Sequence, residues 1–205
     1  MNYHNLTYPD MNNGEGLRVV LWLSGCSHKC RGCQNPQTWD ANSGILFDES
    51  AKEELFRELD KDYISGVTLT GGDPLFEENL DEVLDLVTEV NKRYRRPQHI
   101  DAENEENNNI LNDDADEIRL SYPQKTIWIY TGYKFEDCLI KTKMCEENVI
   151  RALRYEIIKQ CDVLVDGQYI DSLQDITLAF RGSSNQRVID VPKTLSTGKV
   201  VLYIE

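Results

Sequence analysis

The chain lacks the features that mark several large classes of protein. Its 205 residues contain no apolar run near the ~20 residues that span a bilayer, and Met1 to Leu6 lack the basic and apolar regions of a signal peptide. Lys and Arg number 22 against 36 Asp and Glu, a net charge of -14, whereas nucleic-acid binders need clustered cations. We therefore expect a cytoplasmic globular protein whose partners are neither nucleic acid nor membrane.

Cysteine is scarce, at six residues, but three of the six stand close together. Cys26, Cys30 and Cys33 follow directly after an apolar run, and the reducing cytoplasm favours metal ligation over disulfides for such a group. Three thiolates are too few to saturate a four-iron cluster, so a [4Fe-4S] cluster here would keep one iron open for a further ligand. The alternative is zinc bound by the three thiolates and His28, although His28 stands between two ligands at a spacing that crowds a tetrahedron.

Short apolar runs alternate with segments of helical spacing along the chain. The predicted strands are Val19–Leu23, Gly66–Thr70, Lys125–Thr131 and Cys161–Val165, and the predicted helices are Glu49–Leu59, Leu80–Val90 and Glu147–Lys159. This alternation predicts an α/β fold with mostly parallel strands. Ligands bind at the carboxyl ends of such strands, so the cysteine loop, Gly71–Pro74, Thr131–Gly132 and Asp166–Gly167 are expected to share one edge of the sheet.

Residues 93–124 break this alternation. From Asp101 to Arg119 the chain holds eight acidic residues and one basic residue, and it offers almost no apolar face to a core. We interpret the segment as a solvated, acidic surface insertion in a single domain that spans residues 1–205. The tail at about 193–205 is interpreted as a C-terminal extension.

Five sequence blocks lie at or near the predicted turns. They are the Cys-x-x-x-Cys-x-x-Cys loop in its context Gly25–Trp39, then Gly71–Leu75, Tyr130–Tyr133, Val163–Gly167 and Arg181–Gln186. Together they resemble the radical S-adenosylmethionine (SAM) superfamily and, within it, the activating enzymes of anaerobic ribonucleotide reductase. The resemblance runs to about Val191, and both the insertion and the tail exceed what the family usually carries. It implies a partial, open (β/α) barrel of the radical-SAM type.

The resemblance also implies a chemistry for this enzyme. A [4Fe-4S] cluster on Cys26, Cys30 and Cys33 would bind SAM at its open iron. Reductive cleavage of SAM, with an electron from a reduced flavodoxin-type donor, would yield a 5′-deoxyadenosyl radical that forms a glycyl radical on the large subunit of the reductase. The residues expected to contact SAM are Gly32, Cys33, Gln34, Gly71, Gly72, Asp73, Thr131 and Asp166, and no catalytic side chain is expected beyond the cluster and SAM.

Several of these residues have a second interpretation. Either the carbonyls of the Gly71–Asp73 turn or the Asp73 carboxylate would accept from the amino group of SAM. Thr131 either lines the adenosine side or belongs to a structural turn, and Asp166 either binds a ribose hydroxyl or caps the following segment. The loop Arg181–Asn185 either receives the partner's peptide or is structural. The other cysteines (Cys138, Cys145 and Cys161) are too widely spaced for a second cluster and are interpreted as packing residues.

Two other functions compete with this one. The chain could activate a different glycyl-radical enzyme, such as pyruvate formate-lyase, although the Cys-x-Gly-Cys spacing and Trp39 favour the reductase. It could also be a non-enzymatic metal-binding or electron-transfer module. Such a module has no need of four strand-end motifs at one edge of the sheet.

Overall fold

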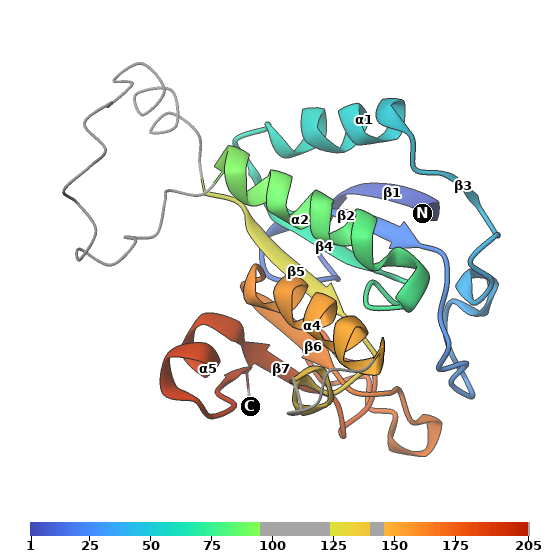
Figure 1. Cartoon of the computed structure of the whole chain (residues 1–205), viewed down its shortest axis with the longest axis vertical. Helices are drawn as coiled ribbons and strands as arrows, with labels where there is room; N and C mark the ends of the chain where they lie inside the picture. The colour runs from blue at the N-terminus through green and yellow to red at the C-terminus, as the bar shows by residue number, and fades with distance from the viewer. Residues whose placement is uncertain (95–123, 140–145, 205) are drawn as a thin grey trace.

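The computed structural model describes residues 1–94, 124–139 and 146–204, and in them the chain forms one open sheet flanked by helices (Figure 1). In sheet order the strands are β3 (Ile45–Leu46), β1 (Asn2–Asp10), β2 (Leu17–Leu23), β4 (Ile64–Gly71), β5 (Thr126–Tyr130), β6 (Val163–Asp166), β7 (Arg187–Asp190) and β8 (Leu202–Ile204). The neighbours β2, β4, β5 and β6 are parallel, whereas β1 and β7 run antiparallel to the strands beside them. The predicted α/β fold with mostly parallel strands is confirmed, and the open sheet is consistent with a partial barrel of the radical-SAM type.

The helices connect successive strands and pack along the sheet. They are α1 (Glu49–Leu59), α2 (Leu80–Tyr94), α4 (Glu146–Lys159) and α5 (Val191–Thr197), with short 3-10 helices η1 (Pro36–Thr38), η2 (Glu77–Asn79), η3 (Phe135–Cys138) and η4 (Asp171–Leu173). The Asp48 carboxylate accepts from the Ala51 N–H at 3.0 Å and so caps α1. Gly198, with φ of +66°, ends α5 in the left-handed conformation that glycine adopts without strain.

One face of the sheet forms the main core with the helices. Alternate residues of the parallel strands, among them Leu21, Leu69, Ile129 and Leu164, are fully buried in one apolar cluster. This cluster also contains the apolar faces of α1 and α2. Val20, Val163 and Val165, which point to the opposite face, are buried as well, and burial on both faces explains why continuous apolar runs predicted these strands correctly.

The other face of the sheet is more polar. Arg18 is fully buried there, with its Nε 2.6 Å from Thr68 Oγ1 and its Nη2 2.9 Å from the Thr126 carbonyl. Its burial lowers the pKa of the guanidinium to about 10. Further along the same face, Trp22 pairs in register with Thr70, and both line the cavity described below.

The strands and helix that the sequence analysis did not predict lie mostly at the two ends of the sheet. They are β1, β3, β7, β8 and α5. The tail interpreted as an extension contributes the end of α5 and the strand β8, which pairs with β7. The predicted insertion lies almost entirely outside the described residues, as does Cys145. Among the described residues, no helix has the length and apolar character needed to cross a membrane.

Candidate metal centre

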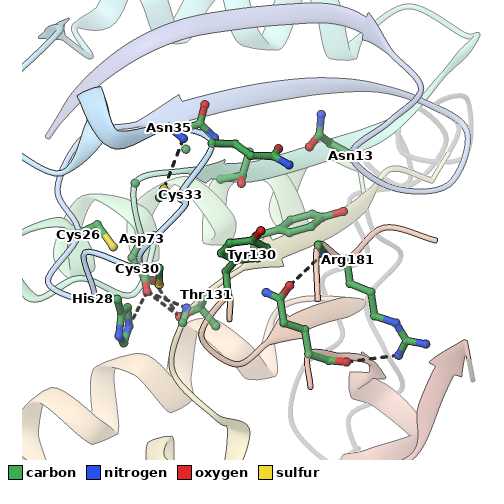
Figure 2. A pocket seen from close by; sticks show the side chains of 18 of the residues that line it. Asn13, Cys26, His28, Cys30, Cys33, Asn35, Asp73, Tyr130, Thr131 and Arg181 are labelled. Carbon is green, nitrogen blue, oxygen red and sulfur yellow. Dashed lines mark hydrogen bonds and ion pairs between the residues drawn. The ribbon is translucent and has the colours of Figure 1, made fainter. Parts of the chain in front are cut away.

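The cysteine loop follows β2 and opens on a cavity of about 580 Å³. Cys26, Cys30 and Cys33 are partly exposed free thiols, and all three line this cavity. Figure 2 shows them on one side of the cavity, with Asn13 and Arg181 on the other side. The volume lies within the range of about 300–1,000 Å³ that is usual for cofactor sites.

Backbone N–H groups are directed at the sulfurs. The Asn35 N–H donates to Cys33 Sγ at 3.4 Å. Burial raises the pKa of Cys30, and a hydrogen bond from the Tyr169 N–H opposes part of this rise. Burial, with a smaller contribution from Asp73, raises the pKa of Cys26 to about 11, although the N–H groups of His28 and Lys29 act in the opposite direction. Hydrogen bonds of this kind stabilise thiolates that ligate iron–sulfur clusters.

The arrangement fits a cluster better than a single metal ion. Within the described ranges, no group of three His, Cys, Asp or Glu side chains is placed to hold one ion. Zinc needs all of its ligands about 2.0–2.3 Å from a single point, whereas in a four-iron cluster each thiolate binds a different iron. The His28 ring also points elsewhere, because its Nε2 lies 3.1 Å from Asp73 Oδ2. The geometry therefore does not support the zinc alternative.

The glycine turn after β4 packs directly on the start of the cysteine loop. The Gly72 N–H donates to the Leu23 carbonyl and the Asp73 N–H to the Gly25 carbonyl, both at 2.7 Å. A Cβ atom on Gly72 would stand 2.5 Å from the Gly25 oxygen, so only glycine allows this approach. Gly71, at φ of +95°, and Gly72 both line the cavity.

The Asp73 carboxylate is occupied by the protein itself. It is 1% exposed and accepts from the Leu75 N–H at 2.8 Å, the Thr131 hydroxyl at 2.8 Å and the Gly132 N–H at 2.9 Å. These bonds join the turn after β4 to the turn after β5. Of the two acceptors predicted for the SAM amino group, the geometry favours the carbonyls of the turn over this carboxylate.

The other predicted SAM contacts divide into two groups. Gln34 and Thr131 line the cavity together with the cysteines and Gly71–Asp73. Gly32 is not among the lining residues; it takes φ of +73° and packs against Asp171, which lies 2.4 Å from the position of a Cβ atom.

Asp166 is the second predicted contact outside the lining. Its buried carboxylate accepts from the Phe135 N–H at 2.8 Å, at the start of η3, and from Arg187 Nε at 2.9 Å. Asp166 therefore caps the start of η3. This helix precedes Asp166 in the chain, whereas the sequence analysis considered a cap on the following segment. The partner of this cap lies 31 residues away in sequence, so no local pattern indicated it.

The cavity lining also includes residues that the sequence analysis did not assign. They are Asp10, Asn12, Asn13, Trp22 and Tyr130. The Tyr130 hydroxyl and Arg181 Nε are buried without a hydrogen-bond partner, and burial raises the pKa of Tyr130. Arg181 and Gly182, from the loop considered as a peptide mouth, do reach the cavity. The alternation of inward side chains along β2 and β5 was the available signal for Trp22 and Tyr130.

Two of the remaining cysteines lie in the core. Cys138 and Cys161 are each 1% exposed, and neither lines the cavity. Burial raises the pKa of Cys138 to about 12, which is typical of an unreactive packing residue.

Comparison with known proteins agrees with the cysteine chemistry. A family model of a 4Fe-4S single cluster domain matches residues 12–114 and 102–189. The anaerobic ribonucleoside-triphosphate reductase-activating protein of Enterobacteria phage T4 is 39% identical over 188 residues, which cover 92% of this chain and 93% of that protein. Proteins of the same name from Escherichia coli K12 and Haemophilus influenzae are 33% and 32% identical over 190 and 188 residues, covering 92% and 91% of this chain and 97% and 96% of theirs. The chain therefore belongs to the family of anaerobic ribonucleoside-triphosphate reductase-activating proteins.

Proposed function

We propose that this protein is an iron–sulfur enzyme that activates anaerobic ribonucleotide reductase by means of SAM. The observation that carries the proposal is the loop of three cysteines, each lining one cavity beside a glycine turn. The names of the relatives support the reductase as the protein that is activated. We assign the activity to a single domain in the cytoplasm, where thiols stay reduced.

The chemistry belongs to the bound groups, and the protein supplies their placement. When bound, the cluster and SAM would supply radical chemistry: one electron from the donor would cleave SAM into methionine and a 5′-deoxyadenosyl radical, which could take a hydrogen atom from a glycine of the reductase. Cys26, Cys30 and Cys33 would each hold one iron. Backbone N–H groups such as that of Asn35 stabilise the thiolates.

The glycine turn would hold the methionine end of SAM. The carbonyls of Gly71 and Gly72 are the acceptors we assign to its ammonium group, since the Asp73 carboxylate is already bonded to Leu75, Thr131 and Gly132. Gln34 and Thr131, which line the same cavity, would contact the rest of the cofactor. We assign Asp166 a supporting role, because its contacts are with Phe135 and Arg187.

The far side of the cavity would receive the reductase. The Tyr130 hydroxyl and Arg181 Nε are buried without a partner, and an unsatisfied buried polar atom is costly unless a ligand completes it. Peptide amide groups can satisfy both atoms. We therefore expect the glycine-bearing segment to enter opposite the cysteines.

The electron would come from a reduced flavodoxin-type protein. Two observations support a protein donor at the cysteine loop: the three cysteines are partly exposed, and Arg31, which lies between Cys30 and Cys33, has a side chain that is 94% exposed even though its Nε is 3.9 Å from Asp171. A cation at this place on a chain of net charge -14 would favour a donor with an acidic surface.

The test is anaerobic activation of purified partners. The reconstituted protein, a reductant and SAM are mixed with anaerobic ribonucleotide reductase or, separately, with pyruvate formate-lyase, and the glycyl radical is measured by electron paramagnetic resonance. We expect the radical on the reductase only, together with methionine and 5′-deoxyadenosine. A radical on the lyase alone would refute the choice of partner. Iron binding without SAM cleavage would instead indicate a non-enzymatic module.

Cysteine variants test the assignment of the iron ligands, and Cys138→Ala is the matched control. Changing any one of Cys26, Cys30 or Cys33 to Ala should abolish both the cluster and SAM cleavage. Cys138→Ala should retain both, because Cys138 is buried outside the cavity. Loss of the cluster in a folded Cys138→Ala protein would contradict the assignment of the ligands.

A further inference from the structure

His28 lies inside the cysteine loop but is directed away from the cysteine ligands. Its side chain is 14% exposed, and its buried Nε2 lies 3.1 Å from Oδ2 of Asp73, close enough for contact although the two atoms do not have hydrogen-bond geometry. Figure 2 shows the ring beside Asp73, next to Thr131. The residue therefore connects the loop between Cys26 and Cys30 to the turn after β4.

The ring is also held by the turn after β5. A Cβ atom on Gly132 would stand 2.3 Å from Cδ2 of His28, so the glycine leaves just enough space for the ring. The ring packs edge-on against Tyr133, with centroids 4.5 Å apart. The hydroxyl of Tyr133 lies 3.1 Å from that of Ser27, the neighbour of His28. Any change in the position of the cysteine loop must therefore move this turn or break these contacts.

Asp73 extends these contacts to the cofactor side of the cavity. The same carboxylate that His28 contacts accepts from the Thr131 hydroxyl and the Gly132 N–H, and the Asp73 N–H donates to the Gly25 carbonyl at 2.7 Å. Three segments far apart in the chain thus meet at one buried carboxylate, which is 1% exposed. Within the loop, His28 is the side chain that touches this carboxylate.

We propose that His28 is a positioning residue that fixes the cysteine loop at the correct distance from the SAM-binding turns. It acts through Asp73 and Gly132, and it binds neither iron nor SAM. Without it, three thiolates would still hold a cluster, but the cysteine loop would no longer stand at a fixed separation from the turn of Gly71 and Gly72. The inference rests on the proposed function, since it assigns SAM to that cavity.

The test compares three substitutions at position 28 with a control histidine. His28→Gln can place an amide nitrogen close to where Nε2 stands, whereas His28→Asn is too short to reach Asp73 and His28→Ala removes the group. His4→Ala is the control, because the Nε2 of His4 lies 2.9 Å from Ser43 Oγ and His4 does not line the cavity. Each protein is reconstituted, its iron and sulfide are counted, and its SAM Kd is measured by equilibrium dialysis.

We expect all four variants to keep a full cluster. His28→Ala and His28→Asn should raise the SAM Kd about 10-fold or more, as loss of an outer contact does at metal sites, and should weaken the change that SAM causes in the paramagnetic resonance spectrum of the reduced cluster. His28→Gln should recover most of both properties, and His4→Ala should match the parent. In the metal-free protein, the Gly132 amide should exchange with deuterium faster in His28→Ala.

Three results would overturn the inference. They are an unchanged SAM Kd and spectrum in His28→Ala, a loss of the cluster in that variant, or a failure of His28→Gln to differ from His28→Ala. If the parent protein itself binds no SAM, the proposed function fails instead, and the exchange rate at Gly132 still tests the contact.

Discussion

At the scale of single residues, the site depends on the backbone of one segment lying against that of another. Gly72 has no room for a side chain, since the Gly25 oxygen occupies the space. The Asp73 carboxylate accepts hydrogen bonds from Thr131 and Gly132 and so holds the turn after β5 against the turn after β4. The position of the cavity wall therefore depends on the absence of a side chain at Gly72 and on the buried carboxylate of Asp73.

Gly72→Ala should therefore disrupt the site. The added methyl group would force apart two backbone segments, at a cost of about 1–3 kcal/mol in the free energy of unfolding, and SAM binding should be lost with it. Urea denaturation and equilibrium dialysis measure the two effects.

Gly198→Ala is the matched control for this prediction. Gly198 has φ of +66° with nothing within 4 Å of a Cβ atom, so alanine there should cost only the left-handed conformation, roughly 1–2 kcal/mol. SAM binding should stay unchanged in that protein. If Gly72→Ala bound SAM as tightly as the parent, the close approach would have no role in the site.

At the scale of elements, the parallel strands could be predicted from the sequence and the outer strands could not. Runs such as Val19–Leu21 are apolar because both faces of the sheet are buried there. β3 has two residues and β8 has three, so each is too short for its apolar residues to be assigned to a strand by their pattern.

The same contrast applies to the site. The cysteines and the glycine turn are local patterns, and the sequence analysis found them together with their common edge of the sheet. Asp73 bonds Thr131 and Gly132, which lie 58 and 59 positions away. Asp166 bonds Phe135 and Arg187, which lie 31 and 21 positions away. No spacing rule predicts such contacts. The roles of these two acids therefore required the structure.

The contact between η3 and β7 predicts a dependence of stability on pH. Hydrogen bonds from Arg187 hold the pKa of Glu136 at about 2, below its ordinary value of 4.5. A lowered pKa in the folded state stabilises the protein above pH 4.5, and this contribution is lost as the pH falls from 4.5 toward 2. Since the Glu136 side chain is 49% exposed, we expect no more than about 1 kcal/mol.

Glu136→Gln should remove this contribution. In the metal-free protein, the difference in the free energy of unfolding between parent and variant should shrink between pH 5 and pH 2.5. Glu78→Gln, at an exposed glutamate in η2, serves as the control and should show no comparable trend. A constant difference across this range would contradict the assigned pair.

The strand β8 should contribute to stability through Tyr203. Its ring packs edge-on against Trp128 with centroids 5.4 Å apart, and its hydroxyl bonds Glu15. Removing residues 200–205 should lower the free energy of unfolding by roughly 1–3 kcal/mol while the cluster is kept, because the cavity does not include this strand. Tyr203→Phe, which keeps the ring, should lose less. A thermal unfolding scan of the three proteins decides the matter.

At the scale of the whole molecule, acidic residues are concentrated in one segment whose composition is unsuited to a core. Asp101 to Asp116 carries many of the acids, and such a segment lacks the apolar surface to join a core. We predict that deleting residues 101–116 leaves the iron content, SAM cleavage and activation of the reductase unchanged. Activation that falls while SAM cleavage persists would reveal a docking role for the segment, and loss of the cluster would show that the fold depends on it.

The partial exposure of the three cysteines also determines where the enzyme can work. A cluster on partly exposed thiols can be reached by a protein that delivers electrons, and it can be reached equally by dioxygen, which is smaller than any donor. An opening wide enough for electron transfer from a donor protein therefore also admits dioxygen. Purification in air should therefore strip the iron within the time of a preparation, and the lifetime of the enzyme in a cell should be set by the local oxygen tension.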